Sequence, residues 1–487
     1  MNVTALVTDT GIELTPDPSR VITRFFVPGR EDLGPGGSRA APVIHRILAL
    51  DELEVESMMT DIVTRFADRH RSLEATFDDH ATRVMSRVES DVELSTARRL
   101  LLGAAFTHEY SVEGAALCNP SAVLHPRQGS MGDASFILSV RCVGEGHRSS
   151  IGFRTGTVTT TGVVTLDPPG RFLATAEARQ TDHHRAMFRA ALADSDDDQD
   201  NVAFVLDSLP PTFSTTTLES RIAALTNDDA TRRDTSTTAT HLRELANSTY
   251  EVQFEKDTLL SERILWPQVP AEHNGLEDAR FVRFVADSGD VTYYATYTAF
   301  DGVNIAQHML QTGDFVQFTS SPLAGRAAIG KGLALFPRQI DGRYVALSRS
   351  DRETNSIAFS DDIRCWPTSE TIQVPERPWE VLQLGNCGPP IETEAGWLVL
   401  THGVGPMRTY ALGAILLDLD DPRCVLGRSA WPIIVPTEGH RDGYVPNVVY
   451  SCGAFAHDDI LVLPYGIADQ TISIATLSVT ELLATLE

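Results

Sequence analysis

Hydrophobic and polar positions follow two different patterns along this chain, and the difference predicts where helices and strands lie. After Asp51, an aspartate suited to cap a helix, apolar residues recur at helical spacing. The apolar residues at this spacing are Leu53, Met58, Ile62 and Phe66. Similar stretches follow around residues 73–90 and 94–107. These spacings predict a small helical region over residues 50–110, whose apolar stripe packs a core or a subunit interface.

From Cys118 onward the pattern changes to short runs of β-branched and aromatic residues, which are typical of strands. A turn, an apolar strand and a polar residue recur five times, roughly 50–65 residues apart once an interruption at 170–262 is set aside. The five units span residues 133–141, 290–298, 341–349, 395–402 and 458–465. This spacing is that of propeller blades, so the sequence predicts a mainly β protein built as a five-bladed β-propeller.

The interruption at residues 170–262 is rich in Ala, Asp, Thr and Arg and has helical patches. Its acidic run from Asp194 to Asp200 lacks the glycine and terminal glutamate of an EF-hand loop, so we expect a solvated loop and not a calcium site. We therefore divide the chain into an extended and helical N-terminal region, residues 1–112, and a propeller catalytic domain, residues 113–487. The helical insertion into that domain covers about residues 170–262.

Composition and charge narrow the classes of partner. The chain is 42% hydrophobic and 22% charged, with a formal net charge of −26 and a pI near 4.9. This balance speaks against nucleic acid or an anionic membrane surface as a partner. No apolar run approaches the ~20 residues of a membrane span. Six cysteines spread singly, and an N-terminus without the features of a signal peptide, predict a cytoplasmic protein with reduced thiols.

Three common kinds of site are not indicated by the sequence. Gly325-Arg-Ala-Ala-Ile-Gly-Lys331 nearly matches a phosphate-binding loop, but Gly332 stands where the magnesium-binding hydroxyl is needed. A strand pattern and Pro337 follow in place of a helix, so we do not expect a nucleotide there, although the lysine suits a simple anion. The sequence has no metal-ligand spacing and no serine or cysteine nucleophile motif, and we predict neither a metal nor a cofactor.

The stretch Gly275-Leu-Glu-Asp-Ala-Arg280 places two adjacent carboxylates at the start of a strand pattern. Because side chains alternate faces along a strand, we expect only one of Glu277 and Asp278 to face a site. In a propeller the ends of equivalent strands gather around a central axis. Arg141, Arg349 and His402 are therefore expected to share a pocket although they lie far apart in the sequence.

At these residues the chain resembles glycoside hydrolase family 130, the five-bladed propeller family of β-mannoside phosphorylases and some β-mannosidases. The resemblance runs from about Asn119 to the C-terminus, apart from the insertion. Its motifs are Gly275-Leu-Glu-Asp-Ala-Arg280 (with Ala279 where proline is usual), Lys331-Gly-Leu-Ala-Leu-Phe-Pro337, Tyr344-Val-Ala-Leu-Ser-Arg349, Gly396-Trp-Leu-Val-Leu-Thr-His-Gly-Val404, Val445-Pro-Asn-Val-Val449 and Pro464-Tyr-Gly-Ile-Ala-Asp469. The Asn386-Cys-Gly-Pro-Pro form resembles a subgroup of longer members.

The resemblance implies a role for each matching residue. Asp278 would be the general acid, which in this family is thought to protonate the leaving oxygen through a sugar hydroxyl. Inorganic phosphate, the co-substrate, would be bound by Lys331, Arg349, His402 and Tyr410. The mannoside would be held by Asn119, Ser121, Arg141, Asp301 and Asp469. The predicted reaction is inverting phosphorolysis of a β-mannoside, with β-1,2-oligomannosides favoured, to give α-mannose 1-phosphate.

Two other functions stay open at this point. An inverting β-mannosidase needs a second carboxylate ~6.5–9.5 Å from the acid to activate water. A non-catalytic propeller would bind carbohydrate without turnover. The basic residues expected at the phosphate, Lys331, Arg349 and His402, are all present, which favours phosphorolysis. The sequence leaves open the linkage, the acceptor-side residues and the oligomeric state.

Overall fold

The computed structural model describes residues 6–28, 39–87, 93–129, 132–193, 197–227 and 234–487, and these residues form two compact units. The smaller unit comprises residues 17–114 and 170–174. The larger unit comprises residues 1–16, 115–169 and 175–487. From the sequence, residues 1–16 were assigned to the N-terminal region. In the structure β1 (Thr8–Leu14) pairs antiparallel with β27 (Thr471–Ser478), so this strand belongs to the larger unit.

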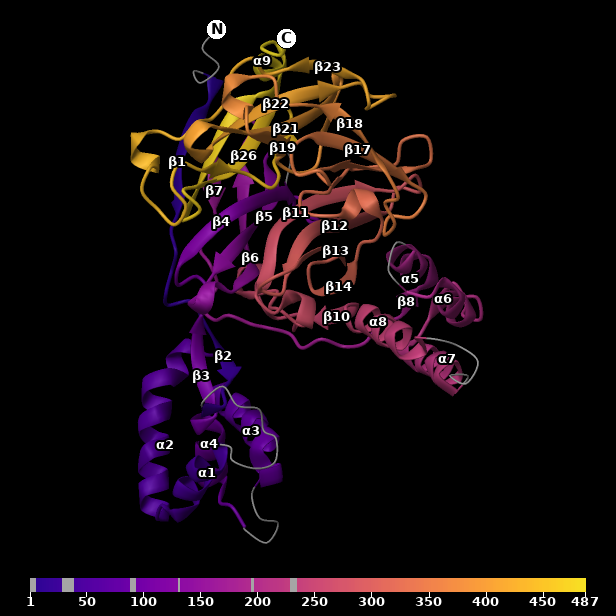
Figure 1. Cartoon of the computed structure of the whole chain (residues 1–487). Coiled ribbons are helices and arrows are strands. Elements are labelled where there is room, and N and C mark those ends of the chain that lie inside the picture. Colours follow the sequence, from indigo (N-terminus) through magenta and orange to yellow (C-terminus); the bar gives the residue numbers. More distant parts are fainter. Residues whose placement is uncertain (1–5, 29–38, 88–92, 130–131, 194–196, 228–233) are drawn as a thin grey trace. The chain divides into compact units, whose positions relative to one another are not determined.

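The smaller unit is a helical bundle beside a two-stranded sheet (Figure 1). Its elements are β2 (Val21–Phe25), α1 (Ala40–Ala49), α2 (Glu52–Phe66), α3 (Leu73–Val84), α4 (Thr96–Ala105) and β3 (Thr107–Ser111). Asp51 accepts a hydrogen bond from the backbone N–H of Glu54 and forms a capping box, as its position before the apolar pattern predicted. Helix α1 was not predicted, because its N-cap residue Arg39 makes no side-chain cap bond and Pro42 interrupts the pattern.

Most strands of the larger unit lie in antiparallel sheets, and the prediction of a mainly β protein is confirmed (Figure 1). The largest sheet contains β4 (Ala116–Leu124), β5 (Ala134–Val143), β6 (Ser149–Val158), β7 (Val164–Leu166), β10 (Tyr250–Gln253), β11 (Gly275–Val285), β12 (Val291–Phe300), β13 (Ile305–Thr312) and β14 (Gln317–Pro322). Its two halves are joined through one parallel pair, Ser149 with Gly275. Gly275 has φ +143°, and a Cβ there would lie 2.6 Å from the backbone nitrogen of Ser149, so only glycine fits this junction.

Three further sheets follow in chain order. The first contains β15 (Ala334–Leu335), β16 (Tyr344–Ser348), β17 (Asn355–Ser360) and β18 (Ser369–Gln373). The second contains β19 (Gln383–Asn386), β20 (Ile391–Thr393), β21 (Gly396–Gly405), β22 (Thr409–Leu417) and β23 (Val425–Arg428). The third contains β24 (Val449–Tyr450), β25 (Phe455–His457), β26 (Ile460–Ile467), β27 and β1, and helix α9 (Val479–Leu483) follows it. The five repeated units of the sequence correspond to β5, β12, β16, β21 and β26.

Apolar side chains of neighbouring sheets pack against one another and form the core. One cluster joins β16 and β17 to β21 and β22, and another joins β21 and β22 to β26 and β27. Two more clusters join β26 and β27 to β5, and β11 and β13 to β16 and β17. Each sheet therefore buries both of its faces between two neighbours, which explains why its strands read as nearly continuous apolar runs.

The described residues of the predicted insertion form four helices with an apolar core of their own. They are α5 (Arg185–Leu192), α6 (Gln199–Leu206), α7 (Thr215–Asn227) and α8 (Thr235–Asn247), with the short strands β8 (His183–His184) and β9 (Thr212–Phe213). The described end of the acidic run is not a solvated loop, because Asp198 caps α6 and the buried Asp197 bonds His241 at 2.9 Å. Residues 194–196 of that run lie outside the described residues.

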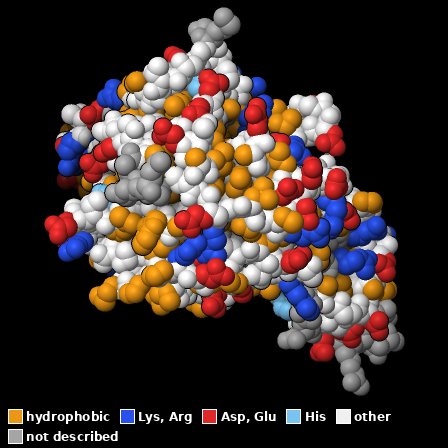
Figure 2. All heavy atoms as spheres, turned by 90° about the horizontal axis from the view of Figure 1, so that it is seen from above, with side chains coloured by type: hydrophobic (Ala, Val, Ile, Leu, Met, Phe, Trp, Pro, Cys, Tyr) orange, Lys and Arg blue, Asp and Glu red, His pale blue; other side chains and the backbone are white. Residues whose placement is uncertain are grey.

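The charge of the chain is dispersed. Figure 2 shows acidic side chains spread over the face it draws, among basic and hydrophobic ones. Among the described residues no helix is long and apolar enough to cross a membrane.

Candidate active site

One cavity of about 260 Å³ gathers charged side chains from the four largest sheets of the larger unit and from the turns beside them. It is lined by Asn119, Arg141, Asp278, Arg280, Lys331, Arg349, His402, Arg408, Tyr410, Val448, Tyr450 and Asp469. The expected meeting of Arg141, Arg349 and His402 is therefore observed. Eight of the ten residues that the sequence singled out line this cavity. Lys331 is notable because the chain has only two lysines, Lys256 and Lys331, among its 40 basic residues.

The remaining two predicted residues lie elsewhere. Ser121 is fully buried, and its hydroxyl accepts a hydrogen bond from the backbone N–H of Phe281 at 3.1 Å. Asp301 follows β12 in a turn, where its carboxylate accepts bonds from the backbone N–H groups of Val303 at 2.7 Å and Asn304 at 2.6 Å. Neither residue lines the cavity. In the structure both side chains accept hydrogen bonds from backbone N–H groups and stabilise the local chain conformation.

The acid motif departs from regular strand geometry at Asp278. The pairing of β11 with β12 shifts register between Glu277 and Arg280, and Asp278 has φ +58°. This bulge breaks the alternation of side chains that a regular strand imposes. As a result both adjacent carboxylates contact one guanidinium: Arg141 donates from Nη2 to Glu277 at 2.6 Å and from Nη1 to Asp278 at 3.1 Å. Of the two carboxylates only Asp278 is among the residues that line the cavity, as expected, while the bulge lets Glu277 bond Arg141 next to it.

The same backbone feature recurs around the cavity. Asn119 lies where β4 shifts register against β5 and has φ +49°. Arg408, in the turn between β21 and β22, has φ +56°, and Asp469, in the turn between β26 and β27, has φ +48°. Such left-handed residues cost free energy and collect at functional sites. Asn and Asp tolerate this conformation better than most residues, which fits their presence at three of the four positions.

Opposing effects set the protonation of the two cavity carboxylates. Burial disfavours the charged form of Asp278, but Arg141, Lys331, Arg280 and a hydrogen bond from Asn119 outweigh it and hold its pKa well below the usual range. Burial also disfavours the charged form of Asp469. Arg141 opposes this effect, the negative charge of Asp278 adds to it, and the pKa of Asp469 rises to about 6. The cavity therefore contains one firmly ionised carboxylate and one that titrates just below neutral pH.

The side of the cavity predicted to hold phosphate contains buried nitrogen atoms without a partner. Arg349 Nε and His402 Nε2 are both buried and have no hydrogen-bond partner among the described residues. Burial, with Arg349 and Arg280 close by, lowers the pKa of His402 well below its usual value. The sequence analysis counted His402 among the basic groups, but in this environment it faces the cavity as a neutral ring. It stacks on Tyr410 with ring centroids 5.9 Å apart.

Four lining residues were not predicted from the sequence. Arg280 lies within the acid motif, and its Nη1 and Nη2 donate to the Asp278 carbonyl and the Tyr450 hydroxyl, each at 3.0 Å. Its place in the motif was a usable signal. Val448 likewise lies in the motif of residues 445–449, whereas Arg408 and Tyr450 have no such signal, because they reach the cavity from a turn and a two-residue strand that no periodicity marks.

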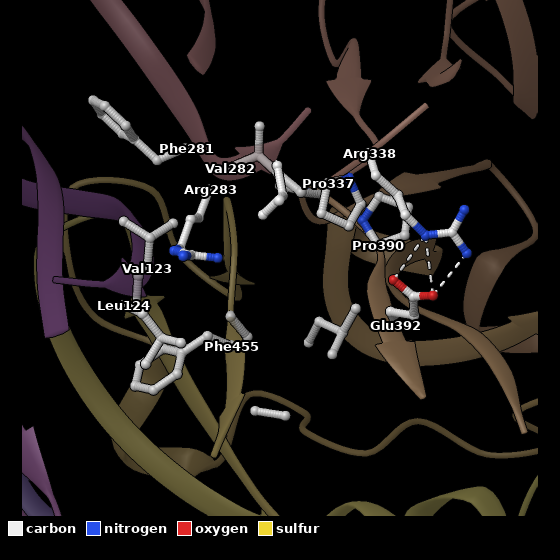
Figure 3. Close-up of a pocket in the computed structure, with 16 residues that line it drawn as sticks. Val123, Leu124, Phe281, Val282, Arg283, Pro337, Arg338, Pro390, Glu392 and Phe455 are labelled. Atoms are coloured by element: carbon white, nitrogen blue, oxygen red, sulfur yellow. Dashed lines mark hydrogen bonds and ion pairs between the residues drawn. The ribbon is translucent and has the colours of Figure 1, made fainter. Parts of the chain in front are cut away.

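A second cavity, of about 270 Å³, is also lined by β4 and β11, farther along both strands. Figure 3 shows Val123 and Leu124 on one side of it, with the ion pair of Arg338 and Glu392 (2.7 Å) on the other. Its lining is mainly apolar and contains no pair of convergent carboxylates. General acid chemistry therefore fits the polar cavity around Asp278 better than this one.

Comparison with known proteins gives a match over the strand-rich half of the chain. The family model of glycoside hydrolase family 130, described as beta-1,4-mannooligosaccharide phosphorylase, matches residues 230–487. A 1,2-beta-oligomannan phosphorylase of Thermoanaerobacter sp. (strain X514) is 35% identical over 232 residues, which cover 46% of this chain and 75% of that protein. A beta-1,2-mannobiose phosphorylase of Listeria innocua is 32% identical over 239 residues, covering 47% and 65% of the two chains.

A solved structure was matched as well. The beta-1,2-mannobiose phosphorylase of Listeria innocua in complex with beta-1,2-mannobiose aligns with a TM-score of 0.46 and 24% identity, covering 77% of this chain and 93% of that chain.

Proposed function

Because this chain belongs to glycoside hydrolase family 130, we propose that it is an inverting phosphorylase of β-mannosides, which uses phosphate to release α-mannose 1-phosphate. The observation that carries the proposal is the cavity that joins Asp278 to Lys331, Arg349 and His402. A phosphorylase needs an acid for the leaving oxygen and an anion site on the opposite face of the sugar. Both kinds of group line this one cavity.

We assign the roles as follows. Asp278 is the general acid, and Arg141, Asn119 and Asp469 hold the mannosyl unit beside it. Lys331, Arg349, His402 and Tyr410 bind phosphate. Cationic donors suit a phosphate dianion by charge and geometry, and the neutral His402 ring adds a hydrogen bond without adding charge. The unpartnered nitrogens of Arg349 and His402 support this assignment, since buried polar atoms normally have partners and these two would gain them from the anion.

We further propose that the larger unit is a five-bladed β-propeller. Support comes from the five repeated strands, each of which is flanked by antiparallel partners, and from the order in which the clusters connect the sheets. In this arrangement β1 completes the blade of β26 and β27. The cavity around Asp278 then lies at one end of the propeller axis. The free state of all six cysteines agrees with a cytoplasmic location, which we also propose.

The decisive experiment compares short β-mannosides with and without phosphate. Phosphorolysis predicts mannose 1-phosphate that forms only when phosphate is present. Release of free mannose at a rate independent of phosphate would instead identify an inverting β-mannosidase. Binding without any turnover would identify a non-catalytic carbohydrate-binding protein.

For the linkage we propose β-1,2. Two relatives named above are a 1,2-beta-oligomannan and a beta-1,2-mannobiose phosphorylase, although the family model is described by a β-1,4 activity. A panel run in the synthetic direction, from mannose 1-phosphate and different acceptors, separates the two. A product with only β-1,4 bonds would overturn the β-1,2 proposal and leave phosphorolysis intact.

A further inference from the structure

Glu277 is a buried carboxylate that bonds two cations of the cavity. Its side chain is only 8% exposed. One oxygen, Oε1, accepts from Arg141 Nη2 at 2.6 Å, and the other, Oε2, accepts from Lys331 Nζ at 2.7 Å. Arg141 belongs to the proposed sugar side and Lys331 to the proposed phosphate side. Glu277 therefore connects the two halves of the proposed site.

Arg141 donates hydrogen bonds to both neighbouring carboxylates, Glu277 and Asp278. Its Nη1 donates to Asp278 at 3.1 Å, while its Nε donates to Ser149 Oγ at 2.9 Å and fixes the plane of the guanidinium. The bulge at Asp278 makes this possible, because it turns two successive side chains toward one cation. Without Glu277, the positive charge of Arg141 and Lys331 would no longer be shared between two adjacent carboxylates.

This sharing matters because a general acid must hold a proton before it can donate one. The surroundings of Asp278 act strongly against that proton, as its lowered pKa shows. The charged and titratable groups that act on Asp278 or feel its charge are Arg141, Lys331, Arg280, Cys118, His402, Tyr450, Cys452 and Asp469. Three of these groups are cations, and Glu277 is bonded directly to two of the three.

We propose that Glu277 is a positioning residue that shares Arg141 and Lys331 with Asp278 and thereby keeps Asp278 able to take up the proton it donates. The inference rests on the proposed phosphorolysis at this site. It also gives Glu277 a second effect: its negative charge stands beside Lys331, where the phosphate dianion would bind. Glu277 thus weakens phosphate binding while it supports turnover.

The test is Glu277→Gln, which keeps the shape of the side chain and removes its charge. The matched control is Glu392→Gln, the same change in the Arg338–Glu392 ion pair at the second cavity. For Glu277→Gln we expect kcat at pH 7 to fall about tenfold or more, as for partial loss of general acid catalysis, and the phosphate KM to fall. The basic limb of the kcat profile, where the acid loses its proton, should move to lower pH. Glu392→Gln should leave all three unchanged.

A conservative variant and a second readout keep the test decisive. Glu277→Asp retains the charge and should restore the position of the basic limb. Acylation of Lys331 relative to Lys256, followed by mass spectrometry, reports on Lys331 without any turnover. Lys331 should react faster in Glu277→Gln than in the wild type, because its ammonium group has lost its carboxylate partner.

Three outcomes would overturn the inference. The first is a kinetic profile of Glu277→Gln equal to that of Glu392→Gln. The second is a fall in kcat with a lower Tm but an unmoved basic limb, which would mark a purely structural role. The third is unchanged reactivity of Lys331 in Glu277→Gln, which would overturn the pairing of Lys331 with Glu277. This readout needs no turnover, so it is separate from failure of the proposed function, which a wild type without phosphate-dependent cleavage would show.

Discussion

Asn119 on β4 donates a hydrogen bond through its side-chain amide to Asp278 on β11, 159 residues later in the chain. Both residues have left-handed backbone conformations, with φ of +49° and +58°, and both lie at register shifts of their strands. Two bulges, on strands β4 and β11 that are not paired with each other, therefore turn an amide and a carboxylate into the same cavity. This relationship places the proposed acid, and each prediction below depends on the cavity that it helps to form.

Removing the acid should abolish most turnover. Asp278→Asn keeps the size and the left-handed tolerance of the residue but cannot donate the acid's proton, so we expect kcat for phosphorolysis to fall ~10²–10⁴-fold. Initial rates with a short β-mannoside and saturating phosphate measure the effect. Asp341→Asn is the control, since Asp341 has φ +50° in an exposed turn outside the cavity lining. Equal rates for the two variants would refute the assignment of Asp278.

Gly385→Ala should damage the phosphate side of the cavity. A Cβ at this position would lie 2.3 Å from Arg349 Cδ and 2.7 Å from His402 Cε1, so both proposed phosphate ligands must shift. We expect the phosphate KM to rise about 10–100-fold, equivalent to roughly 1.4–2.8 kcal/mol of binding free energy. The measurement is a phosphate titration at fixed mannoside concentration. Gly313→Ala, where a Cβ meets no atom within 4 Å, should bind phosphate as the wild type does.

Phosphate should protect one of the two lysines from chemical modification. The side chain of Lys331 is 39% exposed and accessible to an acylating reagent, and Lys256 is exposed outside the cavity. At phosphate concentrations about ten times Kd, we expect acylation of Lys331 to slow roughly tenfold because the bound fraction is shielded. Lys256 serves as the internal control within the same sample, with chloride at equal ionic strength replacing phosphate. If phosphate slowed both lysines equally, Lys331 would not be a phosphate ligand.

Asp469 should make stability depend on pH in a predictable direction. Its pKa in the folded protein, about 6, is higher than its usual value of 3.8. Its contribution to stability is therefore fully present below about pH 4 and is lost as the pH rises through 6. Asp469→Asn carries no such charge, so it should gain stability over the wild type, on the order of 2–3 kcal/mol above pH 7 and close to zero below pH 4.

Denaturant unfolding of Asp469→Asn and wild type at pH 4, 6 and 8 measures that difference. Asp458→Asn is the control, because Asp458 is also left-handed (φ +52°) but its side chain is 68% exposed. A gain for Asp469→Asn that stayed constant over the pH range would contradict the raised pKa. The same variant should lose phosphorolytic activity if Asp469 holds the mannosyl unit.

Much of the site was predictable because short motifs mark it. Asp278, Lys331, Arg349 and His402 each lie in a segment whose local pattern predicts a strand end, and the five-fold repeat predicts that such ends converge. Asp301 lies in none of these motifs and was assigned to the sugar by resemblance alone. In the structure its carboxylate is bonded within its own turn and is not part of the cavity lining. Arg408 and Tyr450 show the limit of such motifs, since they line the cavity without any sequence pattern.

By itself the sequence determined the mainly β class, the helices α2, α3 and α4 and the strands β5, β12, β16, β21 and β26, because these depend on periodicity within a few residues. Only the tertiary structure decided that Glu277 and Asp278 both bond the same guanidinium. Strand alternation separates them, whereas the bulge and the left-handed Asp278 bring both onto Arg141. A bulge is fixed by the partner strand, and Arg141 lies 137 residues from Asp278 in the chain. The protonation of Asp278, Asp469 and His402 likewise follows from burial and from neighbours that are distant in sequence.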